Sequence, residues 1–189
     1  MSKTQHRVMI GATPFLRTQT RQEHQARLIG QDINVPITNI QVVNVYDFFN
    51  MPEEYLPRVV EWTLSDPGCK EPIDAIPDCR YWFAYEYIPG QFDQRADSTE
   101  MCLMLTAPKA TEARVFTSKI LCFDADRELS EEEKKRLRDF FINPLSERIK
   151  DLDAAILPTE RQYERSEYDE KALVCYKHFN QLEDSELEA

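Results

Sequence analysis

The chain has 189 residues, 42% of them hydrophobic and 11% aromatic, enough to build one ordinary domain with an extension, or two very small domains. It carries 23 Lys and Arg residues against 34 Asp and Glu residues, and this net charge of -11 disfavours binding to nucleic acids and to anionic membranes. No apolar run approaches the roughly 20 residues of a membrane-spanning helix. The N-terminus shows no apolar signal region, so we expect a cytoplasmic protein.

Apolar periodicity predicts strands and helices in strict alternation. The first half of the chain predicts a strand over 7–10, a helix over 18–31, a strand over 40–46 and a helix over 52–64. The second half predicts an aromatic strand over 81–88, a helix over 93–105, a strand over 113–123 and a helix that begins after Ser130. Asp93 and Ser130 stand where the N-caps of the third and fourth helices are expected.

The two halves share local details as well as element order. Residues 43–47 end a strand on Asp and precede an acidic helix start, and residues 120–124 do the same in the second half. We interpret this pattern as a duplicated β-α-β-α unit, with repeats at about 5–75 and 80–145. Helices packed on one face of an antiparallel sheet would then give an α+β fold, a ferredoxin-like sandwich. The alternative explanation is that Asp and Pro punctuate elements in many unrelated proteins.

The composition changes beyond Pro144. Residues 146–175 are dominated by charged and polar side chains, and we expect a linker there. Residues 176–189 close on a good helix N-cap and first turn, which we interpret as the truncated start of a further domain. The N-terminal domain is therefore expected to span 1–145.

Few residues suggest chemistry of their own. The five cysteines are scattered and none lies in a C-x-x-C pair, so we expect free thiols rather than disulfides or a zinc site. Cys102 lies in an apolar run and is expected to be a buried thiol. With only four glycines, the sequence has no phosphate-binding glycine loop, and we expect no catalytic residue, metal or cofactor site in this chain.

The most unusual stretch is the polar turn 89–98, between the aromatic strand and the third helix. Functional groups concentrated on a loop of a rigid scaffold favour a binding role. A purely structural interpretation stays open beside it: Gly90 forms the turn, Asp93 caps the helix, and Arg95 and Asp97 lie on its surface. The residues indicate a binding or assembly module rather than a self-sufficient enzyme.

The run E-Y-I-P-G-Q-F-D-Q-R-A-D-S at 86–98 resembles a motif in the N-terminal domain of large single-chain phosphoribosylformylglycinamidine synthases, with Ile88 in place of leucine. Further family-like segments follow the family's order, at 43–47, 114–121, 141–144 and 179–184. The resemblance implies a domain similar to a dimer of the family's small S subunit, followed by the start of its linker domain. It also implies that the complete enzyme uses ATP, Mg²⁺ and glutamine to convert formylglycinamide ribonucleotide into its amidine.

The same resemblance implies an assembly domain of purine biosynthesis that is inactive alone and has the synthetase and glutaminase domains of the same enzyme as partners. The residues expected at the substrate cleft or domain interface are Gln91, Gln94, Arg95 and Asp97. Arg95 would meet a phosphate or a partner carboxylate through its planar fork. The alternative function is a free-standing ferredoxin-like regulatory module that binds a small metabolite or another protein.

Overall fold

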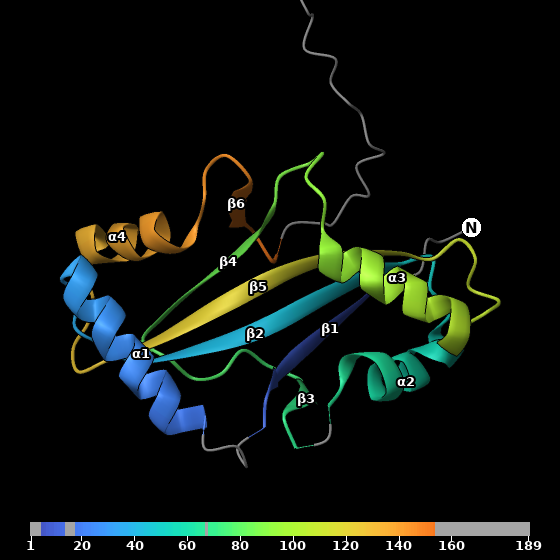
Figure 1. Ribbon diagram of the computed structural model, residues 1–189, viewed down its shortest axis with the longest axis horizontal. Helices are drawn as coiled ribbons and strands as arrows, with labels where there is room; N and C mark the ends of the chain where they lie inside the picture. The colour runs from blue at the N-terminus through green and yellow to red at the C-terminus, as the bar shows by residue number, and fades with distance from the viewer. Residues whose placement is uncertain (1–4, 14–17, 67, 154–189) are drawn as a thin grey trace, which may run out of the picture. The chain divides into compact units, whose positions relative to one another are not determined.

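The computed structural model describes residues 5–13, 18–66 and 68–153, which form a six-stranded antiparallel sheet and four α-helices (Figure 1). The strands are β1 Gln5–Ala12, β2 Ile37–Phe49, β3 Lys70–Ile73, β4 Tyr81–Tyr87, β5 Arg114–Ala125 and β6 Glu147–Lys150. The helices are α1 Thr18–Ile33, α2 Leu56–Val59, α3 Gln94–Thr106 and α4 Glu131–Phe141; a 3₁₀ turn, Glu53–Tyr55, precedes α2 and a π-helical turn, Val60–Leu64, continues it. The predicted α+β class is confirmed. No helix in these ranges is long and apolar enough to cross a membrane.

The strands lie in the order β3-β1-β2-β5-β4-β6, which places the three strands of each half side by side. The central strands β2 and β5 join the halves along their whole length, from Ile37↔Ala125 to Phe49↔Arg114. Both strands are rich in β-branched and aromatic residues, which favour the pleated conformation. Because side chains alternate along each strand, the two faces of the sheet bury separate sets of residues.

All four helices cover the same face, over two cores that lie at opposite ends of the central strands (Figure 1). At one end, Phe48 of β2 packs with Leu103 of α3 and with side chains of α2 and the π turn. At the other end, Ile40 of β2 packs with Ala26 of α1 and Leu137 of α4. Phe48 and Ile40 are an even number of residues apart, so their side chains point to the same face. The middle of this face therefore lies between the two helix pairs.

The opposite face combines a small apolar core with a buried charge network. Asp47 is fully buried, and its carboxylate accepts hydrogen bonds from Arg7 Nε at 2.6 Å and Lys150 Nζ at 2.8 Å. Lys150 is itself buried and also lies 3.2 Å from Glu86. Since a buried charge is stable only when it is paired, these contacts hold β6 to the centre of the sheet. The apolar core beside them contains Val43, Val45, Ala84, Ile120 and Cys122.

The sequence patterns do not predict the two edge strands, β3 and β6. β6 lies inside the segment 146–175 that the sequence predicts as a linker, and the fold therefore extends past the predicted boundary at 145. Its inward-facing residue is Lys150, whose burial depends on a carboxylate more than a hundred residues away along the chain, so no local pattern marks it. The rest of the predicted linker, and the predicted start of a further domain at 176–189, lie outside the described residues.

The predicted helix starts are confirmed at α3 and α4. The Ser130 hydroxyl caps α4, and the Glu133 carboxylate accepts a hydrogen bond from the Ser130 amide at 2.8 Å, which completes a capping box. Arg127 donates to both carboxylate oxygens of Glu133, at 2.7 and 2.9 Å. These hydrogen bonds, that from Arg127 first, lower the pKa of Glu133 to about 2. Glu133 is thus held by both the helix cap and Arg127.

Candidate functional site

The polar turn 89–98 is anchored to the sheet through Asp93. Gly90 adopts a positive φ of 97°, which favours glycine and reverses the chain after β4. Asp93 Oδ1 accepts hydrogen bonds from the amides of Arg95 and Ala96, each at 3.0 Å, which is the N-cap of α3. Its Oδ2 accepts from the Thr117 hydroxyl of β5 at 2.7 Å. One carboxylate therefore starts the helix and fixes the loop to the central strand.

Arg95 points toward the sheet and not into open solvent. Its Nη1 donates to Asn44 Oδ1 of β2 at 2.7 Å, and its guanidinium lies 6.0 Å from the centroid of the Tyr46 ring. Burial raises the pKa of Tyr46, although the nearby Arg95 acts to lower it. The guanidinium is thus held in a defined orientation by a hydrogen bond and an aromatic ring.

A second cation, Lys119, stands beside Arg95 and escapes the sequence analysis. The register of the sheet places Asn44, Lys119 and Tyr85 directly across from one another on β2, β5 and β4. Lys119 Nζ lies 5.8 Å from the Tyr85 ring centroid. Burial, and then the positive charge of Arg95, lower the pKa of Lys119, while burial raises that of Tyr85 to about 12. The sequence signal for this residue is a lysine inside the largely apolar run of β5, and the sequence analysis did not use it.

The structure brings only one of the four sequence-predicted site residues into this cluster. Arg95 is half-buried in it, whereas Gln91, Gln94 and Asp97 are exposed on the turn and the first turn of α3. Phe92, between the two glutamines, is 72% exposed. The motif therefore has an inner part, which fixes the loop and orients Arg95, and an outer part, which presents side chains to solvent.

Large apolar side chains continue from this outer part along α3. Met101, Met104 and Leu105 are 60%, 72% and 81% exposed, at the spacing that places residues on one side of a helix. Leu103, on the sheet-facing side, is buried. Soluble proteins seldom expose several large apolar side chains together unless they form an interaction surface. We call Phe92, Met101, Met104 and Leu105 the α3 patch.

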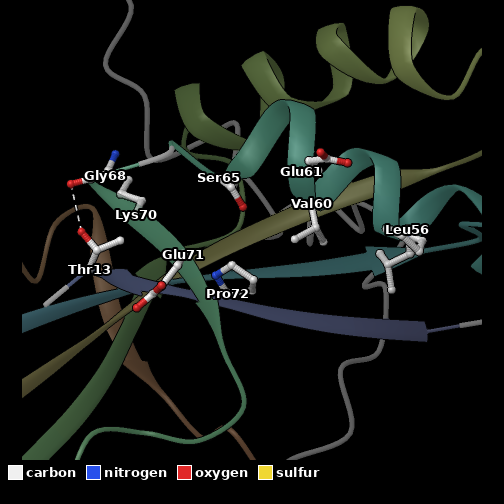
Figure 2. Close-up of a pocket in the computed structure, with 10 residues that line it drawn as sticks. Thr13, Leu56, Val60, Glu61, Ser65, Gly68, Lys70, Glu71 and Pro72 are labelled. Atoms are coloured by element: carbon white, nitrogen blue, oxygen red, sulfur yellow. Dashed lines mark hydrogen bonds between the residues drawn. The ribbon is translucent and has the colours of Figure 1, made fainter. Parts of the chain in front are cut away.

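A separate pocket of about 490 Å³ lies between the edge strand β3 and the helical segment that contains α2 and the π turn. Figure 2 shows Leu56 and Val60 on the helical side and Pro72 on the strand side. The hydroxyl of Thr13 donates to the Gly68 carbonyl at 2.9 Å at one end of the pocket. None of the residues that the sequence predicts for a site lines this pocket.

The described residues contain no cluster of His, Cys, Asp and Glu that would hold a metal ion. The prediction that Cys102 is buried is wrong: the thiol is exposed, because the apolar run around it winds round the whole of α3 and only the side with Leu103 faces the sheet. Burial raises the pKa of Cys79 and of Cys122, which makes these two thiols poor nucleophiles.

Neither a scan against protein-family models nor a search of the curated proteins finds a match to this chain.

Proposed function

We propose that this chain is a non-catalytic assembly domain of a glutamine-dependent amide ligase of the phosphoribosylformylglycinamidine synthase type. On this proposal the chain docks onto the synthetase and glutaminase domains of the same enzyme, in the cytoplasm. Those domains bind ATP, Mg²⁺ and glutamine and carry out the amidation of formylglycinamide ribonucleotide in purine biosynthesis. The chain alone has no activity.

The observation that carries the proposal is the α3 patch beside the motif turn. An assembly domain separated from its partner domains leaves an apolar surface uncovered, whereas an independent module has no such surface to bury. Methionine and aromatic side chains are enriched at protein interfaces, and three of the four patch residues are of these types. The exposed Gln91, Gln94 and Asp97 would form the polar rim around them.

The repeated organisation of the two halves supports the same proposal. The order of elements is repeated in the two halves, and the strand order reads symmetrically about β2 and β5. This arrangement supports a duplicated, ferredoxin-like unit, as expected for a domain similar to a dimer of a small subunit. Because the two halves are joined through their central strands, β2 and β5 pair with each other. In two independent subunits, the same strands would be sheet edges with unpaired backbone groups.

A reconstitution assay tests the proposal. The chain is added to the synthetase and glutaminase domains from the same organism, and amidine formation that depends on ATP and glutamine is followed. We expect activity only when the chain is present, and loss of most of it with Leu105→Asp. Leu28→Asp is the matched control, because Leu28 is 50% exposed on α1, at the other end of the sheet (Figure 1).

Substitutions at exposed positions change folding stability by less than about 0.5 kcal/mol, so a difference between the two variants reports on docking. Equal activity with and without the chain would refute the assembly role. Equal loss with both variants would refute the assignment of the α3 patch.

The second candidate function, a free-standing regulatory module, is favoured by the pocket between β3 and the helical segment. A cavity of about 490 Å³ is within the range that holds small ligands. Saturable binding of a metabolite that is abolished by Val60→Trp, which would fill the pocket, together with failure of the reconstitution, would favour this function over the first.

A further inference from the structure

We propose that Arg95 and Lys119 form a receptor for the phosphate group of a small molecule, in the middle of the helix-covered face of the sheet. The inference rests on the geometry of this cluster and does not depend on the assembly function. The α3 patch, on the outer side of α3, is a different surface.

The site lies in the one stretch of the central strands that separates the two helix-packed cores. Asn44 of β2, opposite Lys119, is placed between Tyr46, which belongs to one core, and Ile40, which belongs to the other. Val42 also points to this face and is 41% exposed. Solvent and solutes therefore reach the middle of the sheet here.

The hydrogen-bond donors of the site are held in place before any ligand binds. The Asp93 cap fixes the backbone of Arg95, and Asn44 Oδ1 accepts from only one of the guanidinium nitrogens. The N–H groups of the planar fork that Asn44 and the adjacent Tyr46 leave free match the oxygens of one phosphate. Lys119, in the next strand, contributes a point charge on a flexible stem.

Neither cation forms an ion pair in the part of the chain that the structure describes, because no carboxylate there lies within 4.0 Å of the charged atoms of Arg95 or Lys119. Asp93 acts on Lys119 from a greater distance, and its two oxygens accept three hydrogen bonds from neutral donors, which hold the carboxylate at the helix cap. Glu147 also acts on Lys119, and it accepts from the Asn143 amide at 3.0 Å. The two half-buried cations thus repel each other in an otherwise strongly acidic protein.

The charge of the site favours a phosphate over a carboxylate. A phosphate monoester carries about -1.5 to -2 at pH 7 and presents three acceptor oxygens, so one group can engage both cations. A carboxylate carries a single charge and leaves one of the two cations unpaired.

The test uses the whole chain and inorganic phosphate as the probe, followed by backbone amide NMR at pH 7 with chloride exchanged to hold ionic strength constant. We expect saturable shifts at Asn44, Arg95 and Lys119. Arg95→Gln and Lys119→Met should each weaken binding at least tenfold, the loss typical of one charge-assisted contact. Lys109→Met, at an exposed lysine in the loop before β5, is the control and should bind like the parent.

The Lys119 side chain makes no hydrogen bond within the described ranges, so Lys119→Met keeps the test valid even where Arg95→Gln disturbs the loop. Shifts that do not saturate, or that persist unchanged in both variants, would overturn the proposal. Glutarate binding as tightly as phosphate would assign the site to carboxylates instead. Glycerol 3-phosphate and a phosphoserine peptide are titrated in parallel, to distinguish a small phosphate ester from a phosphorylated protein as the ligand. Tighter binding of the peptide would overturn the small-molecule assignment.

Discussion

Replacing Lys150 by methionine tests whether the buried charge network holds β6 in the fold. The side chains of Asp47 and Lys150 are 0% and 6% exposed, and their charged atoms are 2.8 Å apart. Methionine preserves most of the aliphatic stem but removes the ammonium group. Among the described residues, Asp47 then keeps the ion pair with Arg7, at 2.6 Å, and Glu86 keeps the one with Arg148, at 2.7 Å.

Removing one partner of a buried ion pair typically costs about 3–5 kcal/mol, because the other charge is left without compensation. Since Arg7 remains bound to Asp47, we expect a loss near the lower end, about 3 kcal/mol of unfolding free energy. In a domain of this size each kcal/mol lowers the melting temperature by about 2–4 °C, so the expected decrease is about 6–12 °C. The fold should survive, because domains are stable by about 5–15 kcal/mol.

Urea unfolding followed by circular dichroism measures the change, with Lys135→Met, at an exposed lysine of α4, as the control. A chain that ends at 145, and so lacks β6, should lose at least as much stability as Lys150→Met. If Lys150→Met unfolds within about 0.5 kcal/mol of the control, the network does not stabilise the sheet and the reasoning fails.

Three further predictions concern the helix starts and the motif turn. Asp93→Ala should lower the free energy of unfolding by about 1–2 kcal/mol and speed amide hydrogen exchange in the turn, because it removes the α3 cap and the hydrogen bond to β5. Asp97→Ala, on the exposed side of α3, is the control and should change neither quantity. Glu133→Gln should destabilise the protein at pH 7. Arg127 lowers the folded pKa of Glu133 to about 2, so the stability difference between the parent and the variant is fully present above the ordinary glutamate pKa of about 4.3. This stability difference should shrink as the pH falls toward 2. A difference in melting temperature that stays constant across that range would contradict the prediction. Gly90→Ala should lower the free energy of unfolding by about 1 kcal/mol through the positive φ alone, since no atom lies near the added methyl group. An unchanged denaturation midpoint would argue against this backbone strain.

Much of the fold follows from local sequence. Runs rich in β-branched and aromatic residues predict the four long strands, and capping residues such as Asp93 and Ser130 predict helix starts that the structure confirms. These signals are local, because side-chain alternation and capping involve residues a few positions apart. The edge strands are different: β6 consists largely of charged residues, and its place in the sheet depends on Lys150 meeting Asp47 across the fold.

For the site, the sequence by itself directs attention to the turn 89–98 and to Arg95, because functional groups are dense there. It does not distinguish the outward-facing Gln91 and Gln94 from Arg95, which turns inward to Asn44. It also provides no reason to connect Arg95 with Lys119, which joins the cluster only through the register between β2 and β5. Composition, capping and alternation are properties of neighbouring residues and are therefore readable from the chain. The meeting of Arg95 and Lys119 beside Asn44 of the other half, and the ion pairs that bury Lys150, are decided only when the strands align in the tertiary structure.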